Sequence, residues 1–93
     1  MTLFFMKIIL YSKKGCPMCD QAKLLFQRAD LEYTEMKVGR ELDITPNELQ
    51  EKYPDAIAYP FITIDRMEFV GIVDVARYLL QKGFVTSNKN GQT

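Results

Sequence analysis

The fold is decided by nine residues that join an apolar run to a helical pattern: Tyr11-Ser12-Lys13-Lys14-Gly15-Cys16-Pro17-Met18-Cys19. Residues 6–11 are apolar apart from Lys7, and residues 17–29 carry apolar side chains at helical spacing. The two cysteines of the chain are therefore separated by two residues at an expected strand-to-helix junction. This layout is typical of a dithiol redox centre.

The two cysteines should not be equivalent. Cys16 precedes the first turn of the expected helix, where the helix dipole is equivalent to roughly half a positive charge and favours a thiolate. Lys13 and Lys14 add positive charge, and no acidic residue occurs before Asp20. We therefore expect Cys16 to be the nucleophile. Cys19, one helical turn further in, should be buried and should resolve a mixed disulfide.

A structural role accounts less well for the cysteine pair. A structural disulfide between residues this close would close almost no loop and would stabilise little. A structural zinc site needs four ligands, whereas the chain has two cysteines and no histidine, so we expect no metal site. Two buried and unreactive cysteines are the remaining alternative to redox chemistry.

Composition limits the class of protein. A chain of 93 residues predicts a single domain, and 47% apolar residues can form one modest core. The 12 basic and 12 acidic residues cancel, which gives no case for binding nucleic acid or a membrane. The apolar residues 1–6 lack the features of a signal peptide, and Lys7 ends them too early for a membrane span. With no export signal visible, we expect a cytoplasmic protein, and in that reducing compartment a close cysteine pair is more often catalytic than structural.

The remaining pattern predicts alternating strands and helices. Strands are expected at 4–11, 32–38, 61–65 and 69–70, and helices at 17–29, 46–53 and 72–80. Thr45-Pro46-Asn47-Glu48 is typical of a capping box at a helix start, and Gly83 is the expected C-cap of the last helix. On the first helix we expect a core stripe of Met18, Ala22, Leu25, Phe26 and Ala29.

Four features together resemble the glutaredoxin family and its thioredoxin-like fold. Tyr11-Ser12-Lys13 is similar to the Tyr-Thr-Lys that precedes the family's motif, and Cys16-Pro17-Met18-Cys19 is similar to its Cys-Pro-Tyr-Cys. Tyr59-Pro60 with the following strand resembles the family's Val-Pro and its strand. Gly71 and Asp74 stand where a Gly-Gly and a nearby Asp are expected. The resemblance covers roughly residues 6–83.

The resemblance implies an α/β fold in the order β-α-β-α-β-β-α, with a four-stranded mixed sheet flanked by three helices. It implies a single domain, which we place at residues 1–84, and the polar, aperiodic end of the chain predicts a disordered C-terminal tail at 85–93. It also implies a monomeric thiol–disulfide oxidoreductase whose redox-active disulfide joins Cys16 and Cys19. Glutathione would be a co-substrate, and no cofactor would be bound.

The resemblance also implies the contacts and partners. Pro60 should follow a cis peptide bond, and the expected glutathione contacts are Lys13, Met18, Tyr59, Pro60, Gly71 and Asp74. Proteins with disulfides would be the substrates; ribonucleotide reductase is a common partner in the family, and nothing in this sequence selects it.

Three residues depart from the family's pattern, and they leave the electron donor open. Met18 replaces a tyrosine, Val70 replaces the first of two glycines, and Val73 stands where an acidic residue is frequent, so that Asp74 would have to take over its role. The alternatives are a dithiol protein reduced by thioredoxin reductase, and a pair of chains that hold an iron–sulfur cluster through Cys16 and glutathione. Pro17 and Cys19 argue against the cluster.

Overall fold

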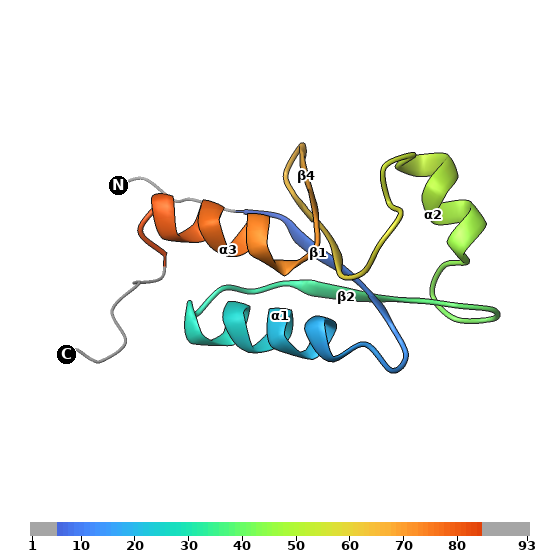
Figure 1. The fold of residues 1–93 in the computed structure, drawn as a ribbon, viewed down its shortest axis with the longest axis horizontal. Coiled ribbons are helices and arrows are strands. Elements are labelled where there is room, and N and C mark those ends of the chain that lie inside the picture. The colour runs from blue at the N-terminus through green and yellow to red at the C-terminus, as the bar shows by residue number, and fades with distance from the viewer. Residues whose placement is uncertain (1–5, 85–93) are drawn as a thin grey trace.

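The computed structural model describes residues 6–84. Its elements are β1 (Ile8–Lys13), α1 (Pro17–Arg28), β2 (Thr34–Val38), α2 (Pro46–Lys52), β3 (Phe61–Ile64), β4 (Met67–Val70) and α3 (Ile72–Gln81). The predicted order β-α-β-α-β-β-α is confirmed (Figure 1). The expected tail at 85–93 and the start of the first expected strand, at 4–5, lie outside the described residues.

The strands form one mixed sheet in the order β2-β1-β3-β4. β1 is central, as its apolar sequence predicts, and pairs parallel with β2 and antiparallel with β3. α1 and α3 lie side by side (Figure 1) and pack on the face that carries Leu10. α2 contributes Leu49 to the core on the opposite face, beside Tyr11. Both faces are therefore covered, and the sheet positions the start of α1. Within residues 6–84, no helix has the length and apolar character to cross a membrane.

The first strand ends later than the sequence predicts. Ser12 and Lys13, which we expected in the turn, belong to β1 because they pair with Lys37 and Val38 of β2. Backbone pairing with β2 thus outweighs the turn-forming character of this stretch. The turn that remains contains Gly15, whose φ of +74° lies in the left-handed region that glycine tolerates best.

The expected core stripe on α1 is wrong at Met18, whose side chain is 47% exposed. The buried residues of this helix are Cys19, Ala22 and Phe26, which have the i, i+3, i+7 spacing of one helical face. Since successive residues on a helix differ by about 100°, the inward position of Cys19 turns Met18 away from the sheet.

The β3–β4 turn and the end of α3 lie within a few residues of the positions that the sequence predicts. The β3–β4 turn is shorter than expected, so Met67 joins β4 and pairs with Ile64. At the end of α3, Gly83 has a φ of +81° and donates its N–H to the Leu80 carbonyl. The Phe84 N–H reaches the Leu79 carbonyl, which completes a Schellman motif.

The predicted capping box at the start of α2 is confirmed. The Thr45 hydroxyl accepts a hydrogen bond from the Glu48 N–H at 3.1 Å, and the Glu48 carboxylate accepts one from the Thr45 N–H at 2.9 Å. The hydrogen bond from the Thr45 N–H lowers the pKa of the Glu48 carboxyl group. α2 is a short helix, so its two end bonds matter for its stability.

Replacing Thr45 with alanine should lower the free energy of unfolding by about 0.5–2 kcal/mol, the usual cost of losing an N-cap side chain. Urea unfolding of Thr45→Ala beside Asn47→Ala, a change at an exposed position in the same turn, measures this difference. Equal stabilities of the two variants would contradict the importance of the cap.

Candidate active site

Cys16 is the N-cap residue of α1. Its backbone is extended (φ −112°, ψ 99°), and its sulfur accepts a hydrogen bond from the Cys19 N–H at 3.1 Å. Pro17 fills the first helical position, where a missing N–H costs no hydrogen bond. The half-buried Cys16 sulfur therefore lies where helix N–H groups stabilise a negative charge.

Cys19 occupies a different environment from Cys16, although both are free thiols. The Cys19 residue is 1% exposed, as expected from its place one turn into the helix. Burial, followed by a hydrogen bond with Cys16, raises the pKa of the Cys19 thiol to about 12, against the opposing effect of the Lys13 backbone. At neutral pH Cys19 is thus a protonated thiol beside a more accessible sulfur.

Four of the expected glutathione contacts are linked to one another, and two of them, Lys13 and Tyr59, lie near the cysteine pair. The Lys13 ammonium nitrogen is 5.7 Å from the centre of the Tyr59 ring. Burial and then the charge of Cys19 raise the pKa of Tyr59. The Tyr59–Pro60 peptide bond is cis, as the resemblance implied. The Gly71 N–H donates to the Pro60 carbonyl at 2.8 Å, which joins the start of α3 to the same region.

The other two expected contacts, Met18 and Asp74, are less closely tied to the site. Met18 projects from the first turn of α1 into solvent. Asp74 lies in the first turn of α3, and its carboxylate is 3.8 Å from the guanidinium of Arg77 on the same helix. A role for either residue in binding glutathione stays a prediction.

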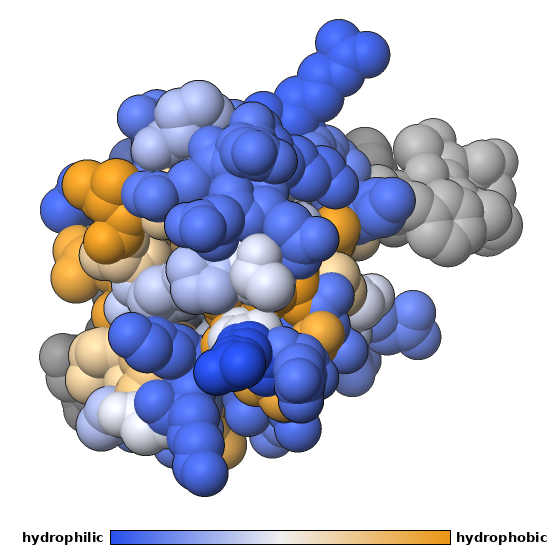
Figure 2. All heavy atoms as spheres, turned by 90° about the vertical axis from the view of Figure 1, so that its right-hand side faces the viewer, coloured by the Kyte–Doolittle hydropathy of each residue, from blue (hydrophilic) through white to orange (hydrophobic). Residues whose placement is uncertain are grey.

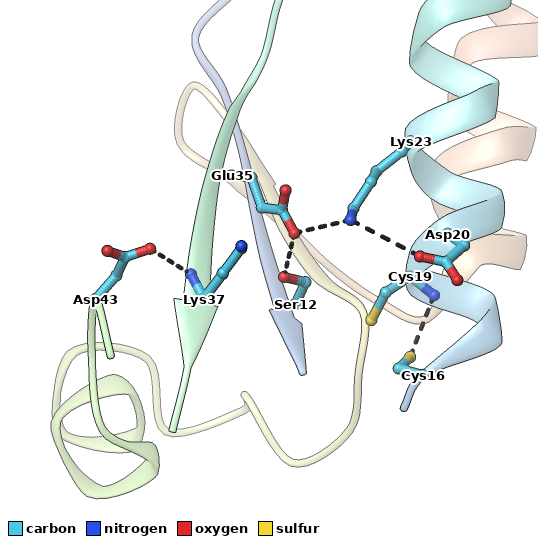
Figure 3. A network of polar contacts seen from close by, with 8 residues as sticks. All are labelled: Ser12, Cys16, Cys19, Asp20, Lys23, Glu35, Lys37 and Asp43. Atoms are coloured by element: carbon cyan, nitrogen blue, oxygen red, sulfur yellow. Dashed lines mark hydrogen bonds and ion pairs between the residues drawn. The ribbon is translucent and has the colours of Figure 1, made fainter. Parts of the chain in front are cut away.

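Sequence reasoning missed a groove of about 590 Å³ beside the cysteine pair. It lies between α1 and β2, and its lining includes Ser12, Lys13, Cys16, Cys19, Lys23, Glu35 and Lys37. Figure 3 shows Glu35 at the centre of a polar network. Its carboxylate accepts a hydrogen bond from the Ser12 hydroxyl at 2.6 Å and lies 3.0 Å from the Lys23 ammonium.

The sequence held one signal for this groove. The alternation of residues 32–38 puts Glu35 and Lys37 on the same side of β2, and Ser12 is the polar residue of β1 that points to that side. The pattern did not reveal that α1 covers this side of the sheet. The end of the molecule that carries the groove is largely hydrophilic, with smaller apolar areas between the polar residues (Figure 2). Residues 6–84 contain no cluster of three or more His, Cys, Asp or Glu side chains placed to hold a metal ion.

Several known proteins are similar to this chain in sequence and in fold. The glutaredoxin family model matches residues 8–69. Glutaredoxin 1 of Rickettsia bellii (strain RML369-C) is 36% identical over 70 residues, which are 73% of this chain and 71% of the relative. The solution structure of a glutaredoxin from Brucella melitensis is 26% identical, with a TM-score of 0.59 over 85% of this chain and 83% of that one.

A crystal structure of glutaredoxin 1 from Francisella tularensis, complexed with cacodylate, is 21% identical and has a TM-score of 0.60 over 83% of this chain and 94% of that chain. At this identity it supports the fold alone, and the α/β thioredoxin-like architecture is the same. The family match includes β1, the helix-capping Cys16 and the buried Cys19. The chain therefore belongs to the glutaredoxin family of thiol–disulfide oxidoreductases.

Proposed function

We propose that the protein reduces protein disulfides and glutathione mixed disulfides through a Cys16/Cys19 dithiol, with glutathione as the electron donor. The observation that carries this proposal is the contrast between the two sulfurs. Cys16 is accessible and hydrogen-bonded at a helix N-terminus, whereas Cys19 is buried and protonated one turn away. One sulfur suits attack on a substrate, and the other suits the following internal step.

The reaction is a series of thiol–disulfide exchanges. The Cys16 thiolate attacks a substrate disulfide, forms a new S–S bond and releases one substrate thiolate, which takes up a proton. Cys19 then loses its proton and attacks the Cys16 sulfur, which releases the second substrate thiol and leaves a Cys16–Cys19 disulfide. Two glutathione molecules reduce that disulfide and leave as oxidised glutathione. On a glutathione mixed disulfide, glutathione itself can replace Cys19 in the second step.

The case for glutathione rests on the groups that surround the cysteine pair. The Lys13 ammonium suits a glutathione carboxylate. The backbone N–H and C=O of Tyr59 suit an extended peptide. Gly71 and the N-terminus of α3 suit the carboxylate at the γ-glutamyl end. The contact between Gly71 and Pro60, and the proximity of Lys13 to Tyr59, support a common surface for these groups.

Coupled reduction assays with each donor in turn test the proposal. With a glutathione mixed disulfide as substrate, turnover should require glutathione and glutathione reductase. Turnover with thioredoxin reductase alone, and none with glutathione, would overturn the choice of donor and favour the alternative that the sequence left open. The cytoplasmic location and the monomeric state stay predictions.

Substitutions of the two cysteines should have different effects on activity. Cys16→Ser should abolish reduction of every substrate, because it removes the attacking sulfur. Cys19→Ser should keep the reduction of glutathione mixed disulfides and lose the reduction of protein disulfides that depends on internal exchange. Both activities are measured with the same glutathione-coupled assay, and retention of activity in Cys16→Ser would reverse the assignment.

Asp74→Ala should raise the KM for the glutathione mixed disulfide if Asp74 holds the γ-glutamyl amine. A charge-assisted hydrogen bond is worth about 1.5–3 kcal/mol. Because solvent screens an exposed contact, the lower value applies here, and it corresponds to roughly a tenfold increase in KM. The Asp74 side chain is 62% exposed, which is why the lower value applies.

The matched control is Arg77→Ala, which removes the partner of Asp74 and leaves its carboxylate. This variant should not raise the KM. A lowered melting temperature of Asp74→Ala with unchanged kinetics would restrict Asp74 to stabilising the start of α3.

A further inference from the structure

The network around Glu35 contains a cation next to the buried cysteine. Cys19 and Lys23 are four positions apart on α1 (i, i+4), which places their side chains on the same helical face. Both residues line the groove beside Cys16. Figure 3 shows Cys19 and Lys23 projecting from α1 toward the strands that carry Ser12 and Glu35. The Lys23 ammonium therefore lies on the same side of α1 as the Cys19 sulfur.

Two carboxylates, one on β2 and one on α1, hold the Lys23 ammonium. Its nitrogen is 3.0 Å from the Glu35 carboxylate on β2 and 3.7 Å from the Asp20 carboxylate on α1. Glu35 is held in turn by the hydroxyl of Ser12 on β1, at 2.6 Å. The side chains of Lys23 and Glu35 are 30% and 23% exposed, so the pair is partly shielded from solvent.

The network is not explained by stability alone. Removing two charges from water offsets much of their attraction, and a well-packed apolar pair is often as stable. Ser12 and Glu35 also lie on the α1 side of the sheet, where their neighbours Ile8 and Leu10 belong to the apolar core. A polar network in this position therefore suggests a role in the chemistry of the adjacent sulfurs.

We propose that Lys23 is a positioning residue for the resolving step: its ammonium group, held by Glu35, stabilises the Cys19 thiolate while it attacks the Cys16 mixed disulfide. The inference rests on the dithiol cycle proposed above. In this step the Cys19 thiol gives its proton to solvent, its sulfur forms a bond to the Cys16 sulfur, and the bond from Cys16 to the substrate sulfur breaks. The departing substrate thiolate takes a proton from solvent, so protons and electrons balance.

The groups that face Cys19 act with different signs. Burial and the Cys16 sulfur raise the pKa of Cys19, whereas the Lys13 backbone and the Lys23 cation lower it. Tyr59, in the segment before β3, is close enough for the charge of Cys19 to add to the effect of burial in raising the pKa of Tyr59. The hydrogen bond from Ser12 lowers the pKa of Glu35, and the bond with Glu35 raises the pKa of Lys23, so both members of the pair stay ionised at neutral pH. Lys23 thus acts as a fixed charge and not as a proton acceptor.

Two substitutions should change the rate at which Cys19 displaces the substrate from Cys16, and they should change it in opposite directions. Lys23→Met removes the cation and should slow internal disulfide formation at pH 7 by about three- to tenfold, the change expected when a nearby opposite charge is lost. Glu35→Gln keeps a side-chain oxygen that can accept a hydrogen bond from Lys23 but removes the negative charge that partly neutralises it, so this variant should accelerate the same step. Arg28→Met removes one positive charge at the far end of α1 and should leave the rate unchanged.

The rate can be measured in a single turnover without any recognition of glutathione. Reduced protein is mixed with excess oxidised 2-mercaptoethanol, quenched with acid at increasing times and analysed by mass spectrometry, which separates the mixed disulfide from the internal disulfide. In the mixed disulfide Cys16 no longer carries the charge that helps to raise the pKa of Cys19, and repeating the series from pH 6 to pH 9 follows the rising part of the pH profile of the second step. In Lys23→Met the rise of this profile should move to higher pH. Melting temperatures of the variants separate loss of folding from loss of charge.

Each outcome has one meaning. Opposite effects of Lys23→Met and Glu35→Gln, with Arg28→Met unchanged, support the inference. Equal slowing by both variants with no shift of the pH profile would assign the network a structural role and overturn it, as would an unchanged second step in Lys23→Met. Failure of the wild-type protein to form a mixed disulfide at Cys16 would instead overturn the proposed function on which the inference rests.

Discussion

The hydrogen bond from the Cys19 N–H to the Cys16 sulfur fixes the geometry on which the redox site depends. It makes Cys16 the cap of α1 and places Cys19 three residues further along the same turn. One turn of helix thereby gives two identical side chains opposite surroundings, since one sulfur lies at the exposed helix end and the other faces the sheet. The proposed difference in reactivity follows from these two positions.

The rest of the fold holds this turn in place. β1 extends to Lys13, so a short turn leads directly from the centre of the sheet to Cys16. Ala22 and Phe26 are fully buried against the sheet, and their packing sets the rotation of α1 about its axis. Full burial of a side chain such as Phe26 is worth about 1.5–3 kcal/mol. The core therefore determines which cysteine faces inward.

The sequence predicted the features that depend on nearby residues. The order of elements, the capping box of Thr45 and Glu48, and the glycine after α3 follow from local patterns, and the cis bond before Pro60 follows from the family resemblance. Features that depend on distant pairing were missed. Ser12 joins β1 because β2 lies beside it, and Glu35 meets Lys23 only once α1 covers β2. Met18 was assigned to the core since periodicity alone does not fix the rotation of a helix about its axis. Local sequence patterns do not show which of the expected residues contact glutathione, because those contacts form only in the complex.

We propose that the fold makes Cys16 the reactive sulfur and keeps Cys19 as a protected thiol. Brief treatment of the reduced wild-type protein with less than one equivalent of iodoacetamide at pH 7, followed by peptide mass spectrometry, measures this difference. We expect the label on Cys16, with Cys19 labelled only after unfolding in urea. Equal labelling of both residues in the folded protein, or preferential labelling of Cys19, would contradict the account.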